Sequence, residues 1–406
     1  MQFRIVPFFL LLLLLSQCGT SEDQLARRAD RIHRSVLTVD THCDTPMSFD
    51  DPGFDMGIRQ EEGSVDFPRM IEGGLDAEFF AVFTGQGPRN DSAYNRVHNK
   101  AMGILDAIHK NVKKNSSLAE IAYTADDAYR LKKNGKLAAF IGIENGYPIG
   151  LDLSRIKQYH DLGARYITLC HSRNNDICDS SNDPGGPEHN GLSQFGIQVV
   201  KEMNNIGMMV DVSHISDKSF YDVLSVTKAP VIASHSSSRA LCCNPRNLSD
   251  DMLLALKGNG GVIQICILSA YLKTIEPNPE MGSKLKELQN RFGSYDTISS
   301  EDRKSQMRKE YREIRKRYEK LAAVTDVVDH IDHVVQVAGI DHVGIGTDFD
   351  GGGGVEGCMN VSEMKNITIE LLRRGYSKKE VEKIWSGNIM RVLRKAEETA
   401  SLQGLS

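Results

Sequence analysis

Histidine and acidic residues follow short apolar segments throughout this chain. Imidazole and carboxylate groups are the usual protein ligands of catalytic metal ions, and they also carry protons in general acid–base catalysis. A lone histidine of this kind is more often a hydrogen-bonded structural residue. Charged groups that converge in a buried place are costly unless a metal ion or hydrogen bonds compensate them, so the joint pattern predicts a metal site. The residues at the ends of six segments are His42 with Asp44, Glu144, His171, His214, His235 and Asp348.

Five of these residues are predicted to bind metal. His42 and Asp44 are two positions apart, so on a strand their side chains point to the same side. The set exceeds the roughly three protein ligands of a catalytic zinc, so we predict two Zn²⁺ ions. His42 and Asp44 would hold one ion, His214 and His235 the other, and Glu144 would bridge them. Ions about 3.5–4 Å apart can share a water and lower its pKa to about 7, which supplies a hydroxide nucleophile. Zn²⁺ suits these ligands, although Mn²⁺, Co²⁺ and Fe²⁺ bind similar ones.

Two strand-end residues remain for the chemistry itself. Asp348 can take the proton of the attacking water and deliver it to a leaving amine, with Asp350 as the alternative. His171 can stabilise the oxyanion of a tetrahedral intermediate. Cys43 lies between two predicted ligands, but its side chain should point to the opposite side of the strand, so we interpret it as a packing residue.

Eight apolar segments, separated by helical patterns, must position these residues. They are almost continuously apolar, which is typical of parallel strands covered on both faces. Eight strands alternating with helices predict an α/β fold, the (β/α)8 TIM barrel, whose active site lies at the carboxyl ends of the strands. An open doubly wound sheet is the alternative, but it normally shows a glycine-rich sequence after the first strand, where this chain has Thr41-His42-Cys43-Asp44. The predicted strands are Val36–Thr41, Ala77–Phe83, Leu137–Ile143, Tyr166–Cys170, Met208–Ser213, Pro230–Ser234, Gly261–Ile267 and His342–Thr347.

Helical spacing of apolar residues accounts for most of the remaining chain, and one segment departs from it. Residues 271–323, after the seventh strand, are long and highly charged, and their mixed signs predict a solvated helical insertion on the catalytic side. A partner-binding arm is the alternative. We expect residues 36–400 to form a single barrel domain. The predicted helices are Arg96–Val112, Phe195–Ile206, Met252–Leu256, Ile367–Arg373 and Lys379–Ala396.

The first 18 residues predict a signal peptide. A basic start precedes the apolar run Ile5–Leu15, which is shorter than the about 17–25 residues that cross a bilayer. The sequence Leu15-Ser16-Gln17-Cys18 resembles a bacterial lipobox, in which Cys18 would be lipidated; a plain signal peptide is the alternative. We therefore expect an exported protein of the periplasm or cell envelope, with the membrane reached only through a lipid on Cys18 and with residues 19–35 leading into the barrel.

Composition excludes several classes of protein. The chain has 406 residues, 49 Lys and Arg against 54 Asp and Glu, and 40% hydrophobic residues, so it is not a disordered chain. A net charge of −5 lacks the basic field of a nucleic-acid-binding protein. Its eight cysteines show no paired CxxC spacing, which argues against a zinc ribbon or a disulfide scaffold.

The strand-end residues and the stretches around them resemble those of the membrane dipeptidase family (renal dipeptidase-like, peptidase family M19) of the metal-dependent amidohydrolases. The resemblance extends from Val39 to about Leu393. Two departures are Cys43, where the family usually has a small or polar residue, and a longer segment after the seventh strand. His330 and His333 match a family stretch but fall on a predicted helix, so we interpret them as structural. The matching stretches are Val39–Pro46, Gly142–Gly146, Met208–His214, Val231–Leu241, Asn244–Leu248, Asp329–His333 and His342–Gly351.

The resemblance implies an enzyme that hydrolyses the amide bond of dipeptides, including those with a C-terminal D-residue. It implies the same binuclear zinc site, with Glu144 as the bridge. By resemblance His171 contacts the substrate and polarises its carbonyl, while Asp348 contacts the substrate and handles the proton. Arg246 would bind the free carboxylate of the dipeptide, a role that suits the planar guanidinium. The resemblance also implies a homodimer.

Two other functions fit parts of the pattern. A non-peptide amidohydrolase, acting on N-acyl amino acids or lactones, would keep the metals and change the substrate, because barrels support many chemistries by loop variation. Related enzymes often bridge their metals with a modified lysine, and the availability of Glu144 favours the dipeptidase instead. A catalytically inactive surface-binding protein is the third hypothesis, and the retained set of ligands argues against it.

Overall fold

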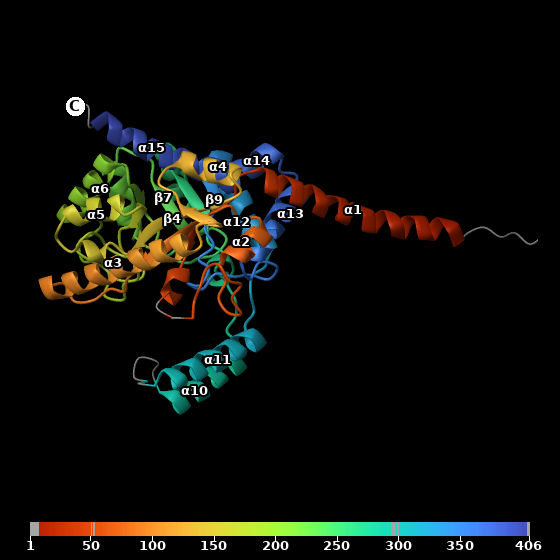
Figure 1. Ribbon diagram of the computed structural model, residues 1–406, viewed down its shortest axis with the longest axis horizontal. Coiled ribbons are helices and arrows are strands. Elements are labelled where there is room, and N and C mark those ends of the chain that lie inside the picture. The colour runs from red at the N-terminus through yellow and green to blue at the C-terminus, as the bar shows by residue number, and fades with distance from the viewer. Residues whose placement is uncertain (1–7, 50, 52, 294–297, 299, 404–406) are drawn as a thin grey trace, which may run out of the picture.

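A parallel β-barrel forms the centre of the protein. The computed structural model describes residues 8–49, 51, 53–293, 298 and 300–403 (Figure 1). Eight parallel strands follow one another around the barrel in the order β1-β2-β4-β5-β6-β7-β8-β9, which confirms the predicted TIM barrel. One short additional strand, β3, pairs beside the start of β4 and was not predicted. The strands are β1 Val39–Cys43, β2 Ala77–Phe83, β3 Ala119–Ile121, β4 Leu137–Glu144, β5 Ala164–Thr168, β6 Met209–Asp211, β7 Ile232–Ser236, β8 Val262–Ile265 and β9 Val343–Ile345.

The barrel closes where β1 meets the segment after β9. The backbone nitrogen of Asp348 donates to the carbonyl of His42 at 3.0 Å. The buried carboxylate of Asp40 accepts hydrogen bonds from the backbone nitrogen of Thr347 at 2.7 Å and from its hydroxyl group. This seam therefore joins two strand ends that the sequence identified as functional, and it brings His42 close to Asp348.

Aromatic side chains fill the interior below the mouth of the barrel. The rings of Phe79 and Phe140 stack with centroids 4.6 Å apart, and Tyr166 stacks on Phe79 at 5.6 Å. All three side chains are buried. Tyr166 occupies the space beside Gly142, where an added Cβ would lie 2.0 Å from the ring. The glycine on β4 therefore makes room for the tyrosine on β5.

Helices cover the outside of the barrel between successive strands (Figure 1). The sequence predicted one helix over Lys379–Ala396, but the structure divides it at a π-helical turn, Lys383–Gly387. The side chain of Asn388 donates to the carbonyls of Ile340 and Val343 at 2.7 and 2.8 Å, so this turn is fastened to β9. Such turns commonly interrupt helices where a local contact requires it. The covering helices are α2 Phe67–Gly73, α3 Asp91–Lys114, α4 Ala125–Lys133, α5 Ser154–Asp161, α6 Gln194–Ile206, α7 Asp217–Val226, α8 Asp250–Asn259, α12 Val324–Val337, α13 Lys365–Arg373, α14 Lys378–Glu382 and α15 Asn388–Gln403.

Helix α1, Phe8–Ser35, leads into the barrel and extends outward from it at its amino-terminal end (Figure 1). Its last turns pack against α13. The buried His33 contacts the Thr368 hydroxyl at 2.8 Å and the carbonyl of Gly73 at 3.0 Å. Within the described part of the chain, no helix combines the length and apolar character needed to cross a bilayer.

The charged segment after β8, the seventh strand of the barrel, forms the predicted helical insertion. After the short helix α9, Ser269–Leu272, the helices α10, Pro279–Phe292, and α11, Glu301–Tyr318, pack against each other. They project away from the barrel as a pair (Figure 1). The chain then returns to the barrel through α12.

The two histidines of α12 have structural partners. His330 is buried, accepts a hydrogen bond from the backbone nitrogen of Ser238 at 3.0 Å and contacts the carbonyl of Leu272 at 2.9 Å. His333 pairs with the carboxylate of Asp250 at 2.7 Å. Both contacts agree with the structural interpretation of these residues.

The close approach of Tyr166 to β4 gives a stability prediction. Gly142→Ala should lower the unfolding free energy by about 1–3 kcal/mol, because the new methyl group overlaps the buried ring. Gly103→Ala is the matched control, since position 103 lies within α3 and has open space around it, and alanine there should stabilise by about 0.5–1 kcal/mol. Urea unfolding measures both changes, and equal stability of the two variants would contradict the packing.

Candidate metal centre

The carboxylate of Glu144 lies at the centre of a buried cluster at the carboxyl ends of the strands. Its Oε1 atom is 3.1 Å from Nε2 of His214 and 3.5 Å from Nε2 of His235. Its Oε2 atom is 3.6 Å from Nε2 of His42. The two oxygens thus face different imidazoles, Oε2 that of His42 and Oε1 those of His214 and His235, and a bridging carboxylate uses its two oxygens in this way.

The ligand atoms of six sequence-predicted residues form three overlapping groups. Within each group these atoms lie no more than 4.8 Å apart, and every member is buried. Nε2 of His42 and Oδ1 of Asp44 have no hydrogen-bond partner among the described residues. Buried polar atoms rarely lack a partner, so the donor set fits divalent cations. The groups are His42 with Asp44 and Glu144, Glu144 with His214 and His235, and His42 with His235 and Asp348.

Opposite charges in this cluster stabilise one another. Burial alone would raise the pKa of Glu144, but the charge of His42 and close contacts with His214 and His235 hold that pKa well below its ordinary value. Burial lowers the pKa of His214 and His235 well below the usual range, which favours the neutral imidazole. Metal ions bind the neutral form of histidine. The surroundings therefore keep these two side chains in the form needed for coordination.

The backbone is bent sharply where several of these residues leave their strands. His214 has φ 70°, Asp348 has φ 61°, and Asn145, directly after Glu144, has φ 75°. Residues other than glycine seldom adopt this left-handed conformation, and such strain tends to concentrate at functional sites. The turns direct the polar side chains toward the mouth of the barrel.

Asp348, rather than the alternative Asp350, belongs to the cluster. Burial and the negative charge of Asp44 raise the pKa of Asp348 well above its ordinary value, so this carboxyl can hold a proton. The carboxylate of Asp350 instead accepts from the Thr45 hydroxyl at 2.6 Å and from the backbone nitrogen of Ser64 at 2.7 Å. Asp350 therefore holds together the loops after β1 and β9.

His171 lies at the open side of the cluster. Its side chain is 28% exposed, whereas that of Glu144 is 4% exposed, and its Nε2 is 3.7 Å from Oε1 of the glutamate. The ring packs edge-on against Phe83 with centroids 4.9 Å apart. His171 is thus positioned to meet a molecule that enters from solvent.

Arg246 approaches the cluster from the loop after β7. Its guanidinium donates to the carbonyl of His235 at 3.1 Å and lies over the ring of Tyr271, 5.2 Å from the centroid. The residue is 2% exposed, and its Nε has no partner among the described residues. A buried guanidinium with unused donor capacity is suited to bind an anionic group such as a carboxylate.

Two hydroxyl groups that sequence analysis missed contact the outer ring nitrogens of two predicted ligand histidines. The Tyr166 hydroxyl is 2.9 Å from Nδ1 of His42, and the Ser234 hydroxyl is 2.8 Å from Nδ1 of His235. Both residues are buried. A buried tyrosine hydroxyl needs a hydrogen-bond partner, so a tyrosine within an apolar strand is the sequence feature that could have indicated this contact.

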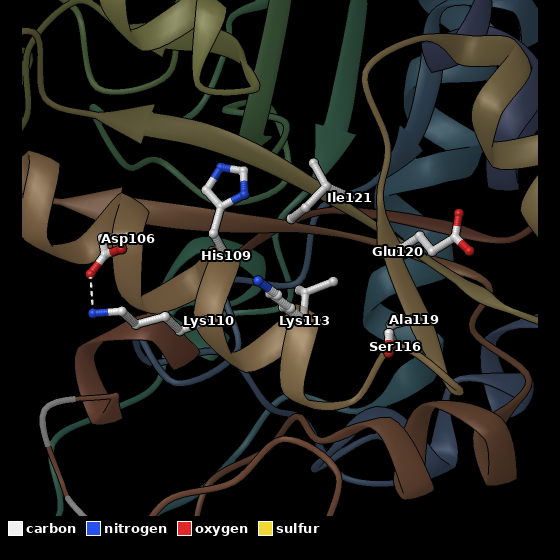
Figure 2. A pocket seen from close by; sticks show the side chains of 9 residues that line it. Asp106, His109, Lys110, Lys113, Ser116, Ala119, Glu120 and Ile121 are labelled. Carbon is white, nitrogen blue, oxygen red and sulfur yellow. Dashed lines mark ion pairs between the residues drawn. The ribbon is translucent and has the colours of Figure 1, made fainter.

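Two surface cavities of the described structure lie apart from this cluster. One, of about 470 Å³, is lined by residues of α3 and β3 on the outside of the barrel, including His109 and the ion pair of Asp106 and Lys110 (Figure 2). The other, of about 440 Å³, lies beside the base of the helical insertion. Neither is lined by a predicted metal ligand.

Comparison with known proteins identifies the family. The model of the membrane dipeptidase family, peptidase family M19, matches residues 26–405. The chain belongs to the membrane dipeptidase family. It is a metal-dependent hydrolase of dipeptides, as its sequence predicted.

Relatives support this membership along most of the chain. Dipeptidase tcpJ of Claviceps purpurea is 35% identical over 346 residues, which cover 84% of this chain and 71% of that protein. The crystal structure of the probable dipeptidase PvdM from Pseudomonas aeruginosa has a TM-score of 0.81 and 31% identity and covers 93% of this chain and all of that one. A metallopeptidase from Rhodobacter sphaeroides, liganded with a phosphinate mimic of the dipeptide L-Ala-D-Ala, shares the fold with a TM-score of 0.70 at 21% identity, over 89% of this chain and 99% of that one.

Metal content provides the direct test of this site in the dipeptidase. Glu144→Gln should weaken zinc binding by more than the roughly 10- to 100-fold that loss of an outer hydrogen-bond partner costs, because it removes the charge shared by three imidazoles. Dialysis against zinc followed by metal analysis measures the change.

Glu78→Gln is the matched control. Glu78 is equally buried but belongs to none of the three groups, and burial with the charge of Asp40 raises its pKa well above the ordinary range. Its zinc content should equal that of the unaltered protein. Normal zinc content in Glu144→Gln would contradict the assignment.

Proposed function

We propose that this dipeptidase holds two zinc ions bridged by Glu144 and uses them to hydrolyse dipeptides, including those with a C-terminal D-residue. The proposal rests on one observation: one oxygen of Glu144 faces the imidazole of His42, and the other oxygen faces those of His214 and His235. His42 and Asp44 are proposed to hold one ion, and His214 and His235 the other. Zinc ions bound there would act as Lewis acids that polarise a carbonyl and lower the pKa of water.

The remaining residues of the cluster divide the reaction between them. Asp348, which lies beside His42 and His235, would accept the proton of the attacking water and transfer it to the leaving amine nitrogen. His171, at the open side, would donate a hydrogen bond to the carbonyl oxygen as negative charge develops on it. Burial of the cluster should favour the proton transfer by Asp348 and the hydrogen bond from His171, because hydrogen bonds to charged groups are stronger where bulk water is largely absent.

Arg246 is proposed to set the length of the substrate. Its guanidinium would bind the free carboxylate of the second residue, which limits cleavage to the amide one residue away from it. The phosphinate mimic of L-Ala-D-Ala in the Rhodobacter sphaeroides metallopeptidase supports acceptance of a D-residue at this position. An N-acyl amino acid carries the same carboxylate, so the non-peptide amidohydrolase remains the competing hypothesis.

Arg246→Ala should reduce kcat/KM for dipeptides by an amount equivalent to about 2–4 kcal/mol, because the substrate carboxylate loses its charged partner. The unaltered enzyme should cleave L,L- and L,D-dipeptides and leave tripeptides intact. Arg394→Ala, which removes a surface arginine paired with Asp126, is the control and should keep full activity. Equal turnover of tripeptides, or activity on N-acyl amino acids alone, would contradict the proposal.

We also propose that the enzyme is exported and acts as a homodimer. Residues 1–18 would form the signal peptide, with Cys18 as the site of lipid attachment. Residues 1–7 lie outside the described part of the chain, and Cys18 falls within α1. Light scattering of the purified enzyme tests the dimer.

Cys18→Ser should move the enzyme from the membrane fraction to the soluble exported fraction, because the lipid is its proposed anchor. Cell fractionation with an activity assay measures the shift, and Cys243→Ser, at an exposed cysteine of the barrel, is the control. A soluble unaltered enzyme would favour the plain signal peptide, and retention in the cytoplasm would contradict export.

A further inference from the structure

The mechanism above makes no use of Asp211, Ser234 or Tyr166, although all three are buried beside the metal ligands. We infer that they are positioning residues: hydroxyl groups of Ser234 and Tyr166 fix the tautomers of His235 and His42, so that each Nε2 presents its lone pair to a metal ion. The inference rests on the proposed metal site and adds the residues that orient its ligands.

Asp211 determines the direction of the hydrogen bonds around Ser234. Its Oδ1 accepts from the backbone nitrogens of Ser213 at 3.0 Å and Ser234 at 2.9 Å. Its Oδ2 accepts from the hydroxyl of Thr168 and, at 2.7 Å, from that of Ser234. A carboxylate accepts hydrogen bonds and cannot donate them, so the single hydroxyl proton of Ser234 points toward Asp211.

The proton on His235 follows from this direction. The Ser234 oxygen lies 2.8 Å from Nδ1 of His235, and since its own proton is already used, it must accept a proton from that nitrogen. Nδ1 therefore carries the hydrogen, and Nε2, which lies 3.5 Å from Glu144 and 2.8 Å from Nε2 of His214, carries a lone pair. The opposite tautomer would place a hydrogen where the metal should lie.

Tyr166, on β5, acts on His42 in the same manner. Its hydroxyl donates to the carbonyl of Thr41 at 3.1 Å, because a carbonyl can only accept. The same oxygen lies 2.9 Å from Nδ1 of His42 and accepts from it. Nε2 of His42 has no partner among the described residues and faces Glu144 at 3.6 Å.

Each proposed ion thus has one histidine held by a buried hydroxyl, and the two hydroxyl groups donate to different acceptors, the Asp211 carboxylate and the Thr41 carbonyl. Outer partners of this kind orient ligand histidines and raise their basicity. Loss of one hydroxyl should therefore weaken its own metal site more than the other site.

The test is a zinc titration of the metal-free full chain against a chelator of known affinity. Two dissociation constants are expected for the unaltered enzyme. Ser234→Ala should weaken one of them by about 10- to 100-fold, and Tyr166→Phe, which keeps the ring, should weaken the other by about the same factor. In each variant the second constant should change by a smaller factor than the first, because the two sites share Glu144 but not the altered hydroxyl.

Ser219→Ala is the matched control, since Ser219 is a buried serine on α7 whose hydroxyl donates to the carbonyl of Asp179 at 3.0 Å, away from the metal ligands. It should keep both constants. Thermal unfolding of each metal-free variant separates a packing defect from a ligand effect, because a positioning role changes metal affinity without a matching loss of metal-free stability.

Unchanged constants in Ser234→Ala and Tyr166→Phe, or the same constant weakened in both, would overturn the inference. Absence of zinc binding by the unaltered enzyme would instead refute the proposed function.

Discussion

Burial of the Glu144 carboxylate is the constraint on which this active site depends. An ionised carboxylate that is 4% exposed is very costly unless opposite charge surrounds it. The charge of His42 offsets this cost, and the imidazoles of His42, His214 and His235 each approach within 3.6 Å of an oxygen of the glutamate. Imidazoles and carboxylates are also the side chains that bind zinc. The contacts that stabilise the buried glutamate therefore also gather the donor atoms of the proposed metal site.

The barrel satisfies this constraint because its strands are parallel and closed. Carboxyl ends of parallel strands meet at one rim, so residues distant in the sequence converge there. The seam between β1 and β9 brings His42 and Asp348 together through a backbone hydrogen bond of 3.0 Å. Left-handed turns at His214 and Asp348 then direct side chains inward, at an energetic cost that the surrounding packing must offset.

Much of this arrangement could be predicted from the sequence because it rests on local patterns. Apolar segments bounded by His42, Glu144 and His235 indicated both the strands and the residues at their ends. The first strand begins three residues later than predicted, at Val39 instead of Val36, and extends to Cys43, because pairing with β2 rather than apolar character defines its limits.

Other features depend on contacts between distant segments and had no local signal. The short strand β3 exists because it pairs with β4, and the π-helical turn exists because Asn388 reaches carbonyls near β9. The hydroxyl partners of His42 and His235 lie on β5 and β7, and their role depends on hydrogen-bond directions that only coordinates reveal. Sequence patterns therefore identified the proposed ligands and left their orientation undetermined.

The most direct test of the central claim is a crystal structure of the zinc-loaded enzyme with anomalous diffraction at the zinc absorption edge. The account predicts two anomalous peaks per chain, one on each side of the Glu144 carboxylate, with His42 and Asp44 at one peak and His214 and His235 at the other. A single peak, or zinc located away from Glu144, would contradict it.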